Sequence, residues 1–297
     1  VVTSADLHAS ARRVWEVLDE ATDLPTGSQP LPEGGLGLTV RGLTVHHGDA
    51  PNGPPALQDI NLTLAPGKVL GVFGPVGSGK STLLSVLARL LPPPRGSVQL
   101  GGVDLLDVAG PDLRQAVAVV PQEPFLFSRS VRDNVGFVDP PERVDDVRVA
   151  KAVQQAQLAG EVARLQDGMQ TVVGEKGLTL SGGQRQRMQL ARALYRGWRL
   201  ILLDDVLSAV DHETESRLLA VLREAIGREQ ASAVIVSHRL TALAHADEIV
   251  VLEDGRITAR GSHASLVAAG GRYADVWAAQ QATPDADADP AVAPALV

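Results

Sequence analysis

Residues 69–82, "VLGVFGPVGSGKST", decide the fold class of this chain. The apolar run that opens the stretch favours a buried strand, and the residues that close it lead into an apolar segment, "STLLSVLARLL", that favours a helix. Between them, Gly74, Gly79, Lys80 and Ser81 stand at the spacing G-x-x-x-x-G-K-[ST] of a phosphate-binding loop. Because the motif requires this passage from strand to helix, the stretch predicts an α/β domain that binds a nucleoside triphosphate.

The chemistry of the loop follows from its residue types. Glycines let backbone N–H groups face phosphate oxygens, and the helix N-terminus adds the positive end of its dipole. Lys80 can reach the β- and γ-phosphates, and the Ser81 hydroxyl can coordinate Mg²⁺. A chance lysine at this position is improbable, because only 4 of the 27 basic residues are lysines. The predicted nucleotide-binding residues of the loop are Gly74, Pro75, Val76, Gly77, Ser78, Gly79, Lys80, Ser81 and Thr82.

The totals of the sequence limit the class of protein. With 297 residues, 44% of them hydrophobic, the chain can form one large domain or two smaller ones with a sizeable core. A net charge of −8 argues against a sequence-independent nucleic-acid surface, so no nucleic-acid partner is predicted. The absence of cysteine excludes disulfides and thiolate metal sites. No stretch approaches the length of an apolar membrane span.

Outside the loop, the pattern favours two kinds of sheet. "LTVRGLTVHH" and "LQDINLTL" predict an antiparallel hairpin before the loop. After it, apolar runs such as "AVAVV", "RLILLDD" and "SAVIVSH" alternate with helical segments, which favours a mainly parallel sheet.

We expect a linker at residues 24–37 and a disordered, Ala/Asp/Pro-rich tail after residue 280. Residues 5–20 fit either a surface helix or a connector from a preceding domain, and a start at Val1 favours a fragment of a longer protein.

A pair of acids ends one of the predicted strands. "RLILLDD" closes with Asp204 and Asp205, and ligands of open α/β sheets bind beyond the carboxyl ends of the strands. Asp204 is the predicted partner of Mg²⁺, through a water molecule. On its own, an Asp-Asp pair fits a helix N-cap nearly as well as a metal site. Its position downstream of a phosphate-binding loop favours the metal.

The octapeptide "LSGGQRQR" (180–187) is a highly specific signature, and with it the chain resembles the ATP-binding cassette (ABC) ATPases. The order of the other motifs agrees: the phosphate-binding loop, "VVPQEPFLF" with Gln122, the signature, "LILLDD", "SAVD" (208–211), and "VIVSH" with His238. The resemblance covers about residues 36–280. It implies a P-loop NTPase (RecA-like) core with a mainly parallel sheet, an antiparallel β subdomain and an α-helical subdomain at about residues 123–190.

Two further stretches, "TVVGEKG" (171–177) and residues 251–277, resemble exporter-type cassettes. In such transporters the cassette is the C-terminal half of a subunit whose N-terminal half spans the membrane. The resemblance therefore implies a connector and linker at residues 1–35, the cassette at 36–280, a tail at 281–297, and a location at the cytoplasmic face of the cell membrane. Glu175 would face the membrane half, although alone it is an ordinary exposed acid.

The family works as a head-to-tail dimer in which each ATP lies between one phosphate-binding loop and the partner's signature. This arrangement implies the following roles. Mg²⁺ would be held by Ser81, Gln122 and Asp204; His238 would contact the γ-phosphate and the attacking water; Asp211 would communicate across the dimer; and Ser181, Gly182, Gly183 and Gln184 would contact the partner's ATP. In isolation, "SGGQ" also fits a helix cap, and a lone histidine is more often structural.

The sequence departs from the family at two positions. Exporter cassettes usually stack an aromatic residue on adenine, and the matching position falls on His47, or else His46. The catalytic glutamate is replaced by Asp205, whose carboxylate is retracted by one methylene. Because a misplacement of about 1 Å can slow a reaction by about 100-fold, we expect this site to bind Mg·ATP and to hydrolyse it slowly.

A weak site beside an intact signature is typical of one half of a heterodimeric exporter. The partner would then be a different subunit with a catalytic glutamate. The alternatives are a symmetric homodimer, a module that uses ATP only to dimerise, and an ABC-type ATPase that acts on nucleic acid or in translation. A role on nucleic acid is disfavoured, because only 59 residues separate Gln122 from Ser181 and no coiled-coil repeat lies between them. A role in translation is disfavoured, because relatives of that type normally carry two cassettes in one chain and this sequence has one phosphate-binding loop. The cargo stays open.

Overall fold

The computed structural model describes residues 27–46, 53–174, 178–208 and 210–282. The predicted connector helix, most of the C-terminal tail, His47 and Glu175 lie outside the described residues.

The larger sheet has six strands in the order β12-β11-β3-β10-β9-β6. Its strands are β3 (Val69–Phe73), β6 (Val117–Val120), β9 (Leu200–Asp204), β10 (Ser232–Val236), β11 (Glu248–Glu253) and β12 (Arg256–Gly261). All neighbouring pairs are parallel except β11 and β12, which form a hairpin. Positive φ angles at Asp254 (46°) and Gly255 (73°) shape the tight turn of this hairpin.

The smaller sheet is antiparallel, in the order β2-β1-β4-β5. Its strands are β1 (Leu38–Val45), β2 (Leu57–Leu64), β4 (Val98–Leu100) and β5 (Val103–Asp104). Buried residues recur at every second position over most of β1 and β2, as expected for strands with one face on a core.

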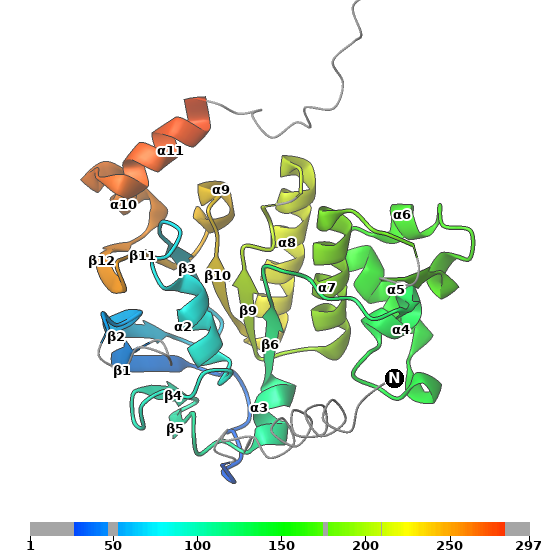
Figure 1. Cartoon of the computed structure of the whole chain (residues 1–297), viewed down its shortest axis with the longest axis horizontal. Helices are drawn as coiled ribbons and strands as arrows, with labels where there is room; N and C mark the ends of the chain where they lie inside the picture. Colours follow the sequence, from blue (N-terminus) through cyan, green and yellow to red (C-terminus); the bar gives the residue numbers. More distant parts are fainter. Residues whose placement is uncertain (1–26, 47–52, 175–177, 209, 283–297) are drawn as a thin grey trace, which may run out of the picture.

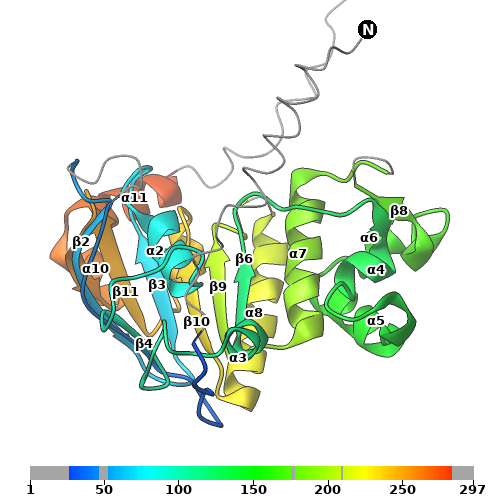
Figure 2. The ribbon, with the colours of Figure 1, turned by 60° about the horizontal axis from the view of Figure 1, so that its bottom comes forward.

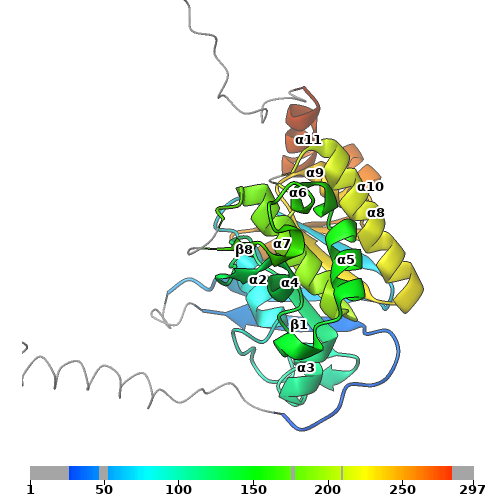
Figure 3. The same ribbon diagram turned by 90° about the vertical axis from the view of Figure 1, so that its right-hand side faces the viewer.

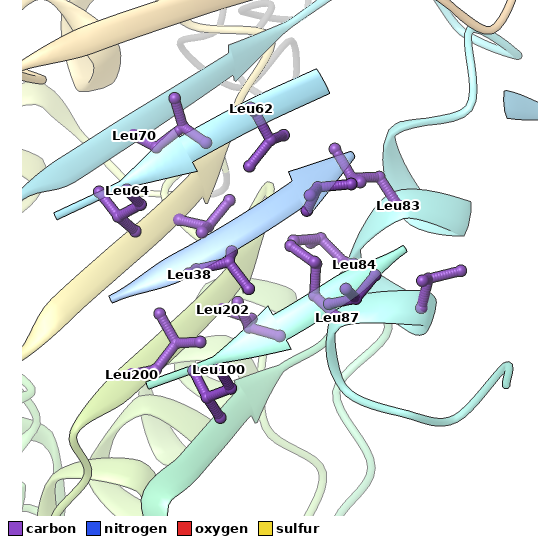
Figure 4. Close-up of a cluster of buried hydrophobic side chains, with 14 of the residues drawn as sticks. Leu38, Leu62, Leu64, Leu70, Leu83, Leu84, Leu87, Leu100, Leu200 and Leu202 are labelled. Carbon is purple, nitrogen blue, oxygen red and sulfur yellow. The ribbon is translucent and has the colours of Figure 1, made fainter. Parts of the chain in front are cut away.

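Helix α2 (Lys80–Leu87) packs against both sheets (Figure 4). Leu83, Leu84 and Leu87 of this helix lie in one buried cluster with residues of the two sheets. The members from the smaller sheet include Leu38, Leu62, Leu64 and Leu100, and those from the larger sheet include Leu70, Leu200 and Leu202. The phosphate-binding loop therefore leads directly into the helix that joins the two sheets.

The opposite face of the larger sheet carries a second core, formed with helices α8 (His212–Glu229), α9 (Leu240–Leu243), α10 (His263–Ala269) and α11 (Arg272–Ala282). Successive residues of a strand alternate between the two cores: Ile201 and Leu203 of β9 lie in this one, and Leu200 and Leu202 in the first. Strands buried on both faces explain the continuous apolar runs of the sequence. The short helix α3 (Gly110–Ala116) precedes β6.

A helical lobe lies beside the sheets, at the right of Figures 1 and 2 and toward the viewer in Figure 3. It comprises α4 (Val131–Val135), η1 (Pro141–Arg143), α5 (Asp146–Gln155), α6 (Ala159–Val162), η2 (Gly168–Gln170), α7 (Gly182–Arg196) and the two-stranded β7 (Arg129–Ser130) and β8 (Val172–Val173). The lobe has its own apolar core, which includes the buried ring of Tyr195. The Tyr195 hydroxyl donates to Asp139 at 2.5 Å.

The predicted fold class is thus confirmed: a mainly parallel sheet, an antiparallel β subdomain and a helical subdomain that carries "LSGGQRQR". Within the described residues, no helix combines the length and the apolar character needed to cross a bilayer.

The packing of α2 predicts a large difference between two leucines in or just beyond this helix. Leu83 is fully buried between the sheets, whereas Leu90 is 67% exposed. We expect Leu83→Ala to lower the free energy of unfolding by about 2 to 5 kcal/mol, because it leaves a cavity in the core. Leu90→Ala should change it by less than about 0.5 kcal/mol. Urea unfolding followed by circular dichroism measures both, and equal effects would contradict the packing.

Candidate functional site

Two glycines of the phosphate-binding loop have no room for a side chain. A Cβ atom at Gly74 would lie 2.1 Å from the carbonyl oxygen of Leu252, and one at Gly79 would lie 2.6 Å from that of Ala56. Gly79 also has a φ of 100°, which disfavours any other residue. The loop is therefore fitted closely between the end of β11 and the start of β2.

Lys80, the first residue of α2, is buried with its ammonium group inside the loop. Its Nζ atom donates to the carbonyl oxygens of Gly74 at 2.8 Å and Pro75 at 2.6 Å. Burial lowers the pKa of Lys80, and the nearby charges of Asp204 and Asp205 oppose this shift. The positive charge is thus held inside the loop, where phosphate groups would lie.

The predicted residues converge on one cavity of about 250 Å³. They come from segments far apart in the sequence, but the carboxyl ends of β3, β6, β9 and β10 meet at one edge of the sheet. The lining consists of Ala56, Val76, Gly77, Gly79, Lys80, Ser81, Thr82, Gln122, Asp204, Asp205 and His238. Gly74, Pro75 and Ser78 belong to the same loop without lining the cavity.

The cavity offers oxygen donors that suit Mg²⁺. The Ser81 hydroxyl, the Gln122 amide and the Asp204 carboxylate all line it. Burial raises the pKa of Asp204, and a hydrogen bond from Ser81 lowers it. Among the described residues no group of three or more His, Cys, Asp or Glu forms a metal cage. A sparse donor set fits Mg²⁺, which takes few protein ligands and completes its shell with phosphate oxygens and water.

Asp205 has a conformation that its position in the sequence does not reveal. It is buried, and its φ of 49° lies in the left-handed region. Its Oδ1 atom accepts the backbone N–H of His238 at 3.2 Å and lies 3.4 Å from the Ser237 hydroxyl. The carboxylate is therefore engaged by the end of β10. The sequence interpretation considered only the length of this side chain and missed these contacts.

The signature residues begin helix α7. Ser181 caps the helix: its hydroxyl accepts the backbone N–H of Gln184 at 3.2 Å, and the Gln184 side chain accepts the N–H of Ser181 at 2.9 Å. Ser181 and Gly182 are exposed, and none of residues 181–184 lines the cavity. This helix terminus therefore lies outside the cavity, and the cap does not conflict with a role toward an anion.

Asp211 caps the next long helix, α8. Its carboxylate accepts the backbone N–H of Thr214 at 2.9 Å and the Thr214 hydroxyl at 2.7 Å. These hydrogen bonds lower the pKa of Asp211. Asp211 is predicted to communicate across a dimer, and within the single chain it also caps α8.

Side chains of α7 hold the segment that follows β6, a link that sequence reasoning missed. The Nε2 atom of Gln186 donates to the carbonyl of Gln122 at 3.3 Å, and that of Gln189 donates to the carbonyl of Phe125 at 2.8 Å. The spacing of three residues puts both amides on one face of the helix, which the sequence could have indicated. This contact joins the signature helix to the Gln122 segment of the cavity.

The sequence matches the family model described as "ABC transporter" over residues 57–208. It is 37% identical over 276 residues to an ATP-dependent lipid A-core flippase of Cupriavidus metallidurans, covering 92% of this chain and 46% of that protein. It is 38% identical to a multidrug resistance-like ATP-binding protein of Escherichia coli, with 92% and 45% coverage. It is 40% identical to a mycobactin import ATP-binding/permease protein of Mycolicibacterium thermoresistibile, with 92% and 46% coverage.

A solved structure of similar fold is a bacterial Atm1-family ABC exporter with ATP bound. Its TM-score is 0.82 at 30% sequence identity, covering 94% of this chain and 48% of that one. The present chain thus spans about half the length of the relatives that it matches.

Two lysines of the chain provide a matched test of the loop. Lys80→Ala should weaken ATP binding by about 10- to 100-fold, because a buried charge-assisted contact to phosphate is lost. Lys68 also lies next to β3, but it is exposed and paired with Asp247 at 2.7 Å, outside the cavity. Lys68→Ala should leave the affinity unchanged. Titration with a fluorescent ATP analogue measures both, and equal losses would contradict the site.

The cap at Asp211 predicts a pH-dependent loss of stability. Asp211→Ala should lower the free energy of unfolding by about 1 kcal/mol near neutral pH. Because the pKa of Asp211 is depressed in the folded chain, its contribution is present above the ordinary pKa of an aspartate and is lost as pH falls through the folded value. Urea unfolding at a series of pH values should show the difference between variant and parent shrinking below about pH 4. A constant difference would contradict the ionic character of the cap.

Proposed function

Since the chain belongs to the ABC transporter family, we propose that it is the ATP-binding domain of an exporter-type transporter and couples ATP hydrolysis to movement of a cargo across a membrane. The observation that carries the proposal is the convergence of the phosphate-binding loop, Asp204, Gln122 and His238 on one cavity. These residues come from four different strand ends, so chance does not account for their convergence on one cavity.

Within this cavity the backbone N–H groups of residues 74–82 would surround the β- and γ-phosphates. Lys80 would exchange its bonds to the carbonyls of Gly74 and Pro75 for phosphate oxygens. Ser81, Gln122 and Asp204 would hold Mg²⁺, which when bound neutralises phosphate charge. His238 would donate a hydrogen bond to the γ-phosphate.

The cavity would hydrolyse ATP slowly. Asp205 stands where the family has a glutamate, and its shorter carboxylate is already engaged by the backbone of His238. A base that is retracted and bound elsewhere is poorly placed to orient a water molecule.

The second contribution of the chain would be to a partner's nucleotide. Two such domains would associate head to tail, and the exposed start of α7 would then face ATP on the partner. Supporting this, Ser181 and Gly182 are exposed and the chain's own cavity uses neither. A partner with a glutamate at the position of Asp205 would make the more active site, which gives an asymmetric pair of two different subunits.

The membrane-spanning half would dock near the Gln122 segment, at the cytoplasmic face of the membrane. Phe125 is 59% exposed and Phe137 40% exposed, and both rings contact Phe127, at centroid distances of 5.0 Å and 4.2 Å. Exposed aromatic clusters are typical of protein interfaces. A contact here would act on the loop that brings Gln122 to the cavity.

The proposal concerns the ATP-driven step rather than a particular cargo. The names of the relatives describe lipid A-core flipping, multidrug resistance and mycobactin import. This chain matches about half the length of each of these proteins.

The test of the slow site is Asp205→Glu. We expect ATP turnover by the 297-residue chain to rise about 10- to 100-fold, because the longer carboxylate reaches toward the attacking water. Adding Lys80→Ala to this variant should remove the increase, which would assign the rate to this cavity. If turnover does not rise although the variant binds ATP as tightly as the parent chain, the short side chain is not the limitation and the asymmetric proposal fails. If the parent chain does not bind ATP at all, the proposed function itself fails.

A further inference from the structure

The peptide groups of His238 are held from both sides by residues far away in the sequence. Its N–H donates to Oδ1 of Asp205 at 3.2 Å, and its carbonyl accepts Nε2 of Gln280 at 2.7 Å. The Oε1 atom of Gln280 also accepts the N–H of Leu240 at 2.9 Å. Asp205 follows β9, whereas Gln280 lies on α11 near the C-terminus. Two separate elements thus fix the orientation of one residue at the cavity.

The backbone of Asp205 is itself anchored for this contact. Its N–H donates to the carbonyl of Val236 at 2.9 Å, which extends the parallel pairing of β9 and β10 by one residue. Its carbonyl accepts the Ser208 hydroxyl at 2.8 Å. With the main chain fixed and φ at 49°, the short side chain is directed to the N–H of His238.

We propose that Asp205 and Gln280 are positioning residues that clamp the His238 peptide at the nucleotide cavity. The clamp rests on the proposed function, since His238 would serve the γ-phosphate. In the clamp, the Asp205 carboxylate accepts a hydrogen bond from a backbone N–H, a role that does not require it to take a proton. Gln280 extends the site to the C-terminal helix α11, which does not line the cavity.

The clamp also accounts for aspartate at position 205. Aspartate and asparagine tolerate the left-handed conformation better than glutamate does. Both have an acceptor oxygen one bond beyond Cγ, at the reach that the His238 N–H requires. The short side chain of Asp205 is poorly placed to act as a general base, but it has the right length to accept the backbone N–H of His238.

The experiment compares Asp205→Asn with Asp205→Gly in the 297-residue chain. Both residues tolerate a positive φ, but only asparagine retains the acceptor. Amide hydrogen exchange, read by NMR, should show the His238 N–H exchanging about tenfold or more faster in the glycine variant and close to the parent rate in the asparagine variant. The N–H of Ser237, bonded to Val72 at 3.3 Å, is the internal control and should keep its protection.

Equal exchange at His238 in the two variants would overturn the clamp, as would a simultaneous loss of protection at Ser237, because that would mean fraying of the whole strand. If the glycine variant does not fold, Asp205→Ala, which also lacks the acceptor, takes its place. ATP binding, measured on the same samples, separates this outcome from failure of the proposed function: a chain that binds ATP without a clamped His238 refutes only the clamp.

Gln280 offers an independent arm. Gln280→Glu keeps an acceptor for the N–H of Leu240 but loses the donor to the His238 carbonyl. We expect ATP affinity to fall about three- to tenfold in this variant. The neighbouring Gln281→Glu is the matched control, because it places the same charge on an exposed position of α11. Equal losses in both variants would attribute the effect to charge and remove Gln280 from the clamp.

Discussion

The burial of helix α2 between two sheets is the constraint on which the rest of the structure depends. Its leucines belong to a single core with strands of both sheets, so the helix axis cannot shift without opening that core. The N-terminus of α2 is thereby fixed at the carboxyl edge of the larger sheet, where the phosphate-binding loop must turn. The lack of space at Gly74 and Gly79 is a direct consequence, because the loop has to pass between β11 and β2.

From this edge, two routes connect the cavity to more distant parts of the chain. One runs from Gln122 to the signature helix through the amides of Gln186 and Gln189. The other runs from Asp205 to His238 and on to Gln280 of α11. The helical lobe and the C-terminal helices have separate cores, yet each reaches the cavity through side-chain bonds to backbone groups. A shift of the helical lobe or of α11 would therefore reach the residues of the cavity through these hydrogen bonds as well as through core packing on the larger sheet.

The sequence predicted those features that local patterns carry. The strand, loop and helix around Lys80 follow from the spacing of a few residues, and the buried strands follow from apolar runs such as residues 200–203. The bonds of Asp205 could not be predicted, because they depend on the register that sets Asp204 beside Val236 in the parallel pair. Likewise, the expected linker contains residues bound to the domain: Arg199 donates to the carbonyls of Pro32 and Gly34, and Gln29 pairs with Val108. Such contacts arise from tertiary structure alone.

Ser181 and Asp205 are held in different ways. The two contributions proposed for the chain, one to its own nucleotide and one to a partner's, can therefore vary independently. Ser181 is held by a capping box that involves only residues three apart, so this cap does not depend on the contacts of Asp205. Asp205 is held by residues of another strand, and its geometry is tied to His238. In the proposed dimer, a change at position 205 would therefore alter the chain's own site without disturbing the cap at Ser181. If two such domains pair as proposed, the local constraint on Ser181 and the long-range constraint on Asp205 would give the pair a physical basis for asymmetry.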